Sequence, residues 1–350
     1  MSSAPVSLLP LPSQPASVRW PTDDWPTGPA PDGLDDTVDH LFVDTDRWGT
    51  TYAVAVVHRG HLVAERYGGA LEHWDAEAEP VEPTTRLLSW SMAKSVLHAA
   101  VGVLVGDGRL DLHAPAPVPA WGGDERRAIT LDDLLAMRDG LAFAEDYEDA
   151  DRSDVIAMLF GSGQHDVAAY AEARTRAHPP GEVFNYSSGT SNIVAAIVGR
   201  TVGSGQDTVD FLHDRLFEPI GMTSAQPRLD GAGTFVGSSY LYATARDYAR
   251  FGLLYLRDGT WDGRRILPEG WADLARTHRS TDPTDGRGYV SHWWVEPVDA
   301  RGGFWASGYD GQFIRCVPAL DLIVVRLGKS PGEQSDRLVE WRDEVISRFT

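Results

Sequence analysis

Cysteine and basic residues are both scarce in this 350-residue sequence. It contains one cysteine, Cys316, and 31 lysines and arginines against 51 aspartates and glutamates, which gives a formal net charge of −20. A single cysteine excludes an intrachain disulfide and a four-cysteine zinc site. The sequence also lacks a basic run that would displace counterions from nucleic acid or bind an anionic membrane surface. We therefore expect neither a nucleic-acid partner nor a membrane partner.

Long apolar runs and two familiar hydrolase motifs are missing as well. No stretch approaches the roughly 20 apolar residues of a membrane span. The first residues carry no early basic cluster and are interrupted by prolines, so we expect no secretory signal and a cytoplasmic protein. There is no G-x-S-x-G, the nucleophile elbow of α/β-hydrolases, and no zinc-binding H-E-x-x-H. We expect no metal and no cofactor.

Candidate strands lie towards both ends of the sequence, with helices between them. Residues 51–57 and 62–67 flank a short turn and predict a β-hairpin, and residues 311–317 and 322–327 predict a second one. This arrangement predicts an α+β fold: a mainly antiparallel sheet built from both chain ends, flanked by helices, with an inserted all-helical region. Helices are predicted at residues 34–44, 91–105, 131–138, 152–160, 167–174, 190–202, 209–217, 244–258, 269–277 and 333–349.

The sequence also predicts how the chain is organised. Residues 1–32 are rich in proline, serine and threonine and predict an extended N-terminal arm. Residues 33–105 and 240–350 together predict the α/β part that holds the antiparallel sheet. Residues 106–239 predict a mostly helical part. We expect the active site to lie between these two parts.

The sharpest local motif is Ser91-Met92-Ala93-Lys94, an S-x-x-K at the start of a predicted helix. Positions i and i+3 of a helix share one face, so the two polar side chains can meet. Free N–H groups at a helix N-terminus favour negative charge developing on a serine oxygen. A lysine serves as the base for such a serine if burial lowers its pKa. The alternative is a helix-capping serine beside a solvated lysine.

Two further segments add to this motif. Tyr186, in Asn185-Tyr186-Ser187-Ser188-Gly189, precedes a predicted helix; it either relays a proton or is a half-buried aromatic anchor. The segment 306–312 enters the first strand of the last predicted hairpin. Its small residues allow a substrate to approach the backbone, and a strand N–H with that of Ser91 would form an oxyanion hole. The alternative for residues 306–312 is a simple strand-entry turn.

The order of these three motifs resembles the serine β-lactamase and penicillin-binding-protein superfamily, whose signature includes S-x-x-K and a strand K-T-G. The surrounding segments 88–95, 129–141 and 242–252 are similar to 6-aminohexanoate-dimer hydrolases and related family VIII-type esterases. The similarity runs from about Tyr52 to the C-terminus. It implies a β-lactamase/transpeptidase-like fold.

The resemblance also implies roles for individual residues. Ser91 would be the acylated nucleophile, Lys94 its general base, and Tyr186 the proton donor to the leaving group. The backbone N–H groups of Ser91 and Tyr309 would hold the oxyanion. The residues implied in substrate binding or support are Tyr147, which would lie on a substrate-covering loop, Ser188, Ser307 and Gly308.

One departure from the superfamily pattern narrows the function. Ala306 stands where K-T-G has a lysine, the cation that helps to bind a substrate carboxylate in β-lactamases and D,D-peptidases. With the missing export signal, this favours a cytoplasmic amidase or esterase acting on a small, neutral or cationic substrate through an acyl-enzyme. A β-lactamase or D,D-peptidase, and a catalytically inactive binding or sensor protein, are the alternatives. A homodimer is left open.

We expect structural roles, rather than roles in catalysis, for several other polar and aromatic side chains. Cys316 lies in an apolar, strand-prone run and predicts a buried thiol. His98 is on the Ser91 face of the helix, but about 10 Å along the axis, too far for direct proton transfer. We expect core packing for Trp293, Trp294 and Trp305, solvated turn residues in His58 and His61, and solvated acidic runs at residues 35–36 and 145–151.

Overall fold

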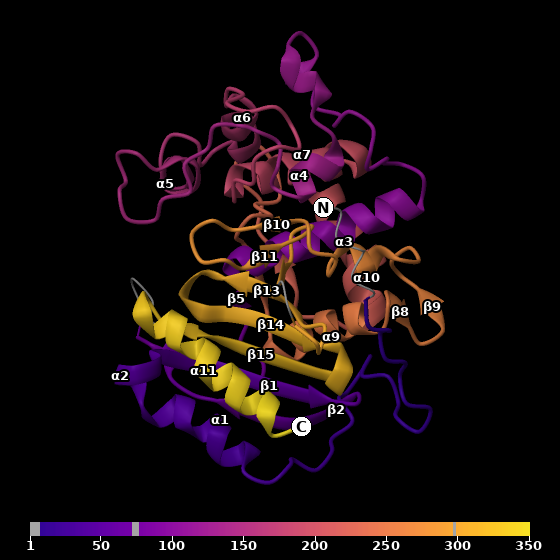
Figure 1. The fold of residues 1–350 in the computed structure, drawn as a ribbon, viewed down its shortest axis with the longest axis vertical. Helices are drawn as coiled ribbons and strands as arrows, with labels where there is room; N and C mark the ends of the chain where they lie inside the picture. The colour runs from indigo at the N-terminus through magenta and orange to yellow at the C-terminus, as the bar shows by residue number, and fades with distance from the viewer. Residues whose placement is uncertain (1–7, 72–76, 297–298) are drawn as a thin grey trace.

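An eight-stranded antiparallel sheet lies at the centre of the computed structural model, which describes residues 8–71, 77–296 and 299–350 (Figure 1). The strand order is β10-β11-β12-β13-β14-β15-β1-β2, so the pairing of β15 with β1 joins the two ends of the chain. The predicted α+β class and the sheet built from both chain ends are therefore confirmed. The strands are β1 Thr50–His58, β2 His61–Tyr67, β10 Ser280–Thr281, β11 Gly288–Tyr289, β12 Trp294–Val295, β13 Phe304–Gly308, β14 Gln312–Val317 and β15 Leu322–Lys329.

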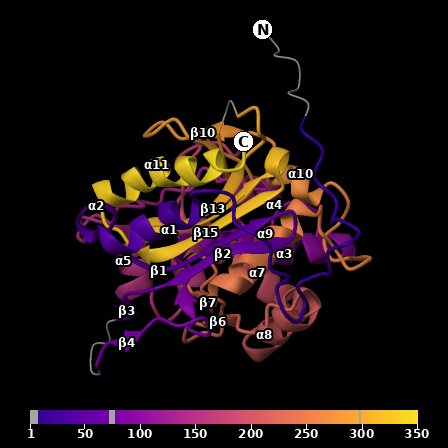
Figure 2. The same ribbon diagram turned by 90° about the horizontal axis from the view of Figure 1, so that it is seen from below.

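Both faces of this sheet are buried, as the continuous apolar run in β1 requires. Alternate residues of β1 enter different clusters: Val54 and Val56 pack on one face, and Ala53, Ala55 and Val57 on the other. Helices α1 (Leu34–Val43) and α11 (Glu333–Ser347) cover the first face (Figure 2). Helix α9 (Ala245–Leu256) packs on the second.

Apart from α2 (Thr45–Trp48), which was not predicted, the remaining helices agree in position with the predicted ones, with ends that differ by a few residues. Several have the side-chain caps that stabilise a helix start: Ser187 accepts a hydrogen bond from the Thr190 N–H, and Thr130 forms a capping box with Asp133. These helices are α2 Thr45–Trp48, α3 Ala93–Gly106, α4 Leu131–Leu135, α5 Asp154–Phe160, α6 Val167–Glu172, α7 Ser188–Val202, α8 Gln206–Leu212, the π-helix His213–Phe217 and α10 Trp271–Leu274.

Short strands and 3₁₀ turns make the connections. The small sheet β5-β7-β6 holds the chain immediately before α3. The strands outside the large sheet are β3 Ala70–Leu71, β4 Glu79–Pro80, β5 Leu87–Leu88, β6 Gln226–Pro227, β7 Leu241–Ala243, β8 Thr260–Trp261 and β9 Arg264–Arg265. The 3₁₀ turns are η1 Trp90–Met92, η2 Pro119–Trp121, η3 Glu125–Ala128, η5 Glu218–Ile220, η6 Tyr309–Gly311 and η7 Pro318–Leu320.

The predicted last hairpin is present as β14 and β15, but the segment 306–312, which was expected to enter its first strand, also contains the end of another strand. Residues 306–308 end a separate strand, β13, which pairs with β14, and Tyr309 lies in the turn η6 between them. Strands β10, β11 and β12 were not predicted, because two residues are too few to show alternation.

The N-terminal segment is held by side chains of α9. Residues 8–32 contain no helix and no strand, while residues 1–7 lie outside the described part. The Arg250 guanidinium donates to the Pro21 and Asp23 carbonyls, at 2.6 and 3.0 Å. No helix in the described ranges is long and apolar enough to cross a membrane. The division into an α/β part and a helical part at residues 105/106 and 239/240 stays a prediction.

Candidate active site

Ser91 sits in the turn η1, which leads directly into helix α3. Strand β5 precedes the turn, and the Ser89 N–H donates to the Leu241 carbonyl at 2.8 Å. Trp90 takes a left-handed backbone conformation with φ 45°, which is uncommon for a bulky residue. Because the turn is anchored by the small sheet, this strained conformation is maintained and fixes the position of Ser91.

The Lys94 ammonium group lies 2.9 Å from the Ser91 hydroxyl, as the S-x-x-K spacing predicts. Lys94 is 1% exposed, and its Nζ also donates to the Ser188 hydroxyl at 3.1 Å and to the Ser238 carbonyl at 2.9 Å. Burial lowers the pKa of Lys94 to about 8, although the nearby carboxylate of Glu145 acts in the opposite direction. A substantial fraction of Lys94 is therefore neutral at slightly alkaline pH.

Tyr186 reaches the same serine from the loop that precedes α7. Its side chain lines the same cavity as Ser91, and its ring centroid lies 5.0 Å from Lys94 Nζ. Burial raises the pKa of Tyr186, so that its hydroxyl keeps its proton at neutral pH. The rings of Tyr289 and Trp294 pack against it, with centroids 5.7 and 5.4 Å away. The structure thus brings Ser91, Lys94 and Tyr186 together.

Ser188 connects Lys94 to a carboxylate that the sequence analysis missed. The Ser188 hydroxyl donates to Glu145 Oε1 at 2.6 Å, and the Ser188 N–H donates to Oε2 at 2.7 Å. The prediction of a solvated acidic run at residues 145–151 is wrong for Glu145, whose carboxylate accepts both of these hydrogen bonds. The spacing to Tyr147 is the signal that could have found it, because residues i and i+2 of an extended segment face the same way.

Tyr147 and Tyr309 form an aromatic border beside Ser91. The Tyr147 hydroxyl donates to Glu145 at 2.5 Å, and its ring centroid lies 5.3 Å from that of Tyr309. Tyr309 in turn contacts Trp90 edge-on, with centroids 5.7 Å apart. Both tyrosines are nearly half-exposed, at 45% and 46%. They are therefore accessible to a molecule bound at Ser91.

Gly308 lets strand β13 approach the nucleophile turn closely. A Cβ at this position would lie 2.4 Å from the Ser89 carbonyl oxygen, well inside van der Waals contact. The glycine thus places the end of β13 beside η1, and Ser307 and Gly308 line one cavity together with Ser91. All the residues singled out as site candidates from the sequence lie in this region.

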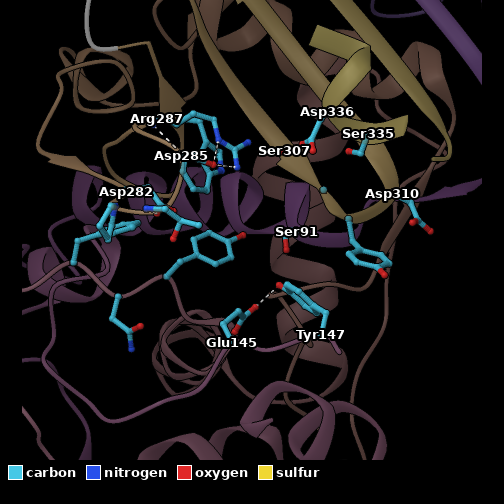
Figure 3. A pocket seen from close by; sticks show the side chains of 18 of the residues that line it. Ser91, Glu145, Tyr147, Asp282, Asp285, Arg287, Ser307, Asp310, Ser335 and Asp336 are labelled. Carbon is cyan, nitrogen blue, oxygen red and sulfur yellow. Dashed lines mark hydrogen bonds and ion pairs between the residues drawn. The ribbon is translucent and has the colours of Figure 1, made fainter. Parts of the chain in front are cut away.

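A cavity of about 580 Å³ opens over Ser91 and is rich in carboxylates (Figure 3). Arg287 is the one cation among the described residues that line it; it is paired with Asp285, and its guanidinium lies 4.7 Å from the Trp294 ring centroid. The carboxylates in the lining are Glu145, Asp282, Asp285, Asp310 and Asp336. Their excess favours a neutral or cationic group in this cavity.

The core-packing prediction is confirmed for all three tryptophans, although one of them also contacts the site. Trp293 stacks on Phe251 in the core, and Trp305 packs under the guanidinium of Arg315. Trp294 is buried too, but it also lines the Ser91 cavity beside Tyr186. Trp293, the preceding residue, faces the opposite side of the sheet, so only one of these two tryptophans can face the cavity.

Cys316 and His98 are both buried in the core and lie outside the site. Cys316 is buried in β14, which confirms the core thiol, and burial raises its pKa. His98 is fully buried and bonded to the Tyr255 hydroxyl at 2.7 Å, away from Ser91. Within the described ranges, no group of three or more histidine, cysteine or acidic side chains is arranged to hold a metal ion.

A serine–lysine pair at the start of a buried helix, beside an antiparallel sheet flanked by helices, defines the class of β-lactamase and penicillin-binding-protein-like serine hydrolases. Residues 35–346 match the family model described as Beta-lactamase. The chain belongs to this family.

Relatives at the level of sequence and fold agree with this assignment. The chain is 27% identical over 268 residues to a 6-aminohexanoate-dimer hydrolase of Paenarthrobacter ureafaciens, covering 71% of this chain and 67% of that one. It is 27% identical over 328 residues to penicillin-binding protein 4 of Amycolatopsis lactamdurans, covering 82% and 78%. A solved structure of a 6-aminohexanoate-dimer hydrolase homologue from Bacillus anthracis shares the fold, with a TM-score of 0.74, 21% identity and coverage of 97% and 89%.

Proposed function

We propose that this protein hydrolyses a carboxamide or carboxylic ester through an acyl-enzyme on Ser91. The observation that carries the proposal is the 2.9 Å contact between Lys94 Nζ and the Ser91 hydroxyl, with the Lys94 pKa lowered to about 8. A serine hydroxyl needs a nearby base to become a nucleophile, and a partly neutral lysine at hydrogen-bonding distance is such a base.

In the proposed acylation, Lys94 accepts the proton of Ser91 and Tyr186 protonates the leaving group. Neutral Lys94 takes the Ser91 proton as Oγ attacks the carbonyl carbon, and the N–H groups of Ser91 and Tyr309 stabilise the oxyanion. Tyr186 gives its proton to the leaving amine or alkoxide as the bond to the acyl carbon breaks. Protonated Lys94, 5.0 Å from the Tyr186 ring centroid, then returns a proton to the tyrosine. Both groups end as they began.

Deacylation reuses the same groups. Neutral Lys94 takes a proton from an attacking water, the tetrahedral intermediate collapses, and the proton passes to the Ser91 oxygen as the acid leaves. Ser188 bonds both to Lys94 and to Glu145, so the Glu145 carboxylate keeps the lysine oriented through both half-reactions. The proposed substrate-facing residues are Tyr147, Ser307 and Gly308, which line the cavity.

The substrate we propose is an amide or ester of the kind cleaved by a 6-aminohexanoate-oligomer hydrolase. Sequence similarity to such an enzyme supports it. A β-lactamase or D,D-peptidase is the second candidate, favoured by the similarity to a penicillin-binding protein. Ala306, buried and uncharged, stands where those enzymes have a carboxylate-binding lysine, which supports the first candidate.

The test compares wild type with Ser91→Ala on p-nitrophenyl esters, 6-aminohexanoate dimer and nitrocefin. We expect turnover of the esters or the dimer, and loss of at least ~10³-fold in kcat for Ser91→Ala. Ser95→Ala, which removes a buried hydroxyl from the same helix, is the matched control and should retain activity. Full activity in Ser91→Ala would refute the proposal. Nitrocefin turnover would favour the β-lactamase candidate, and no labelling by a fluorophosphonate would favour an inactive binding protein.

A further inference from the structure

A second cavity, of about 440 Å³, also opens at Ser91, and its lining is apolar. This size lies within the ~300–1,000 Å³ range of small-molecule sites. Helix α5 forms one wall with side chains at i, i+1, i+4 and i+5, which lie on one helix face: Val155, Ile156, Leu159 and Phe160. Trp90 and Tyr309 lie across from them. We call this space the apolar cavity, and the carboxylate-lined space over Ser91 the polar cavity.

Large apolar side chains remain uncovered at the apolar cavity. Of the seven described large apolar side chains that are exposed, three lie here: Phe160 at 57%, Tyr309 at 46% and Tyr147 at 45%. An exposed apolar patch of this kind beside a nucleophile favours a bound apolar group. The cavity is continuous with Ser91 itself, so that group belongs to the molecule that Ser91 attacks.

The proton donor decides which part of the substrate enters which cavity. Tyr186 lines the polar cavity and does not appear in the described lining of the apolar cavity, where Ser188 lies instead. The leaving group must be beside the group that protonates it, so it occupies the polar cavity. The acyl group is on the other side of the scissile bond and extends into the apolar cavity.

We propose that the apolar cavity is the acyl-binding pocket and selects substrates with an uncharged aliphatic acyl chain, while the polar cavity takes the leaving group. This rests on the proposed function, because it assumes that Ser91 is acylated. It also predicts a departure from the aminohexanoate substrates: a terminal ammonium on the acyl chain would have to be desolvated among Ile156, Leu159 and Phe160 without a partner.

The experiment measures kcat/KM for the p-nitrophenyl esters of acetate, butanoate, hexanoate and octanoate, and of 6-aminohexanoate. We expect about a fourfold increase for each methylene until the cavity is filled. Hexanoate should exceed 6-aminohexanoate by at least about tenfold. Equal rates along the series, or preference for 6-aminohexanoate, would overturn the inference.

Variants locate the selectivity. Ile156→Trp fills the cavity and should lower the octanoate-to-acetate ratio of kcat/KM values by about tenfold or more. Phe160→Glu places a charge at a largely exposed position of the cavity wall and should lower this ratio as well. Val43→Trp, at an exposed aliphatic position on α1, is the matched control and should leave the ratio unchanged. A ratio unaffected by both cavity variants would overturn the inference. If no ester acylates Ser91 at all, it is the proposed function that fails.

Discussion

At the scale of residues, the surroundings of Lys94 set the pH at which the proposed chemistry operates. Its base form is the neutral amine, so kcat/KM should rise with pH and level off above about 8, the pKa to which burial lowers this lysine. A pH profile of ester hydrolysis by the wild type measures this rising limb. A rate that is independent of pH between 6 and 9 would contradict the role of Lys94.

Replacing Glu145 should shift the rising limb of the pH profile of kcat/KM to lower pH. The Glu145 carboxylate raises the pKa of Lys94 against the effect of burial, so Glu145→Gln should lower it and shift the rising limb to lower pH. Glutamine still offers an acceptor to Ser188. Glu148→Gln, in the same loop but exposed, is the control and should leave the profile in place. A shift to higher pH in Glu145→Gln would show that the carboxylate acts otherwise.

The residues of the site differ in how far the sequence could predict them. Ser91 and Lys94 meet through a three-residue spacing on one helix face, which is local geometry. Glu145 and Ser188 are 43 positions apart, and their contact depends on how the acidic loop folds against the start of α7. Tertiary packing of this kind leaves no periodic signal in the sequence. An acidic run therefore predicts a solvated loop even when one of its carboxylates belongs to the site.

At the scale of elements, the close approach of strand β13 to the nucleophile turn should be sensitive to one methyl group. Gly308→Ala places a Cβ against the Ser89 carbonyl, so β13 or the turn must move. A displacement of about 1 Å in a catalytic site costs ~10²-fold in rate, and we expect a loss of kcat/KM of that order. The kinetics should be measured alongside thermal unfolding, so that lost activity is separated from lost folding.

Gly123→Ala is the matched control for this substitution. Gly123 has open space where its Cβ would lie, and its φ is not in the left-handed region. It should keep wild-type activity. Unchanged activity in Gly308→Ala would mean that the approach of β13 to Ser89 does not position the site.

Elements were predictable in proportion to their length. Helix α5 and the strands β1 and β15 carry enough residues to show their period, and each was expected close to its observed position. Strand β13 was not predicted; the segment 306–312, which contains its last residues, was expected only to enter the following strand. The position of α5 beside Ser91 depends on tertiary packing, which leaves no signal in the sequence of the helix.

At the scale of the whole molecule, part of the net charge of −20 lies in the cavity over Ser91, where it would act on a bound substrate. The polar cavity holds five carboxylates and one arginine that is already paired. Among hexanoyl amides with cationic, neutral and anionic leaving amines, we expect kcat/KM to fall in that order. Because surface charges are screened over about 8–10 Å, the differences should shrink as salt is added. Asp336→Asn should also reduce the differences in kcat/KM among the three amides. A preference for the anionic amine would contradict this prediction and point to Arg287 as a carboxylate-binding group.

The global architecture followed from the positions of the two predicted hairpins. Strands near both ends of a chain can share one sheet only if the ends meet, and β1 and β15 do pair. Cytoplasmic location and a homodimer stay predictions.

The central claim is that Ser91 carries the acyl group, and mass spectrometry of the intact protein tests it most directly. Wild type and Ser91→Ala would be mixed with p-nitrophenyl hexanoate, quenched in acid within the first turnovers, and mapped by peptide. The account predicts one hexanoyl group on the wild-type peptide that contains Ser91, and none on the variant. No adduct on wild type despite turnover, or an adduct on another residue, would contradict it.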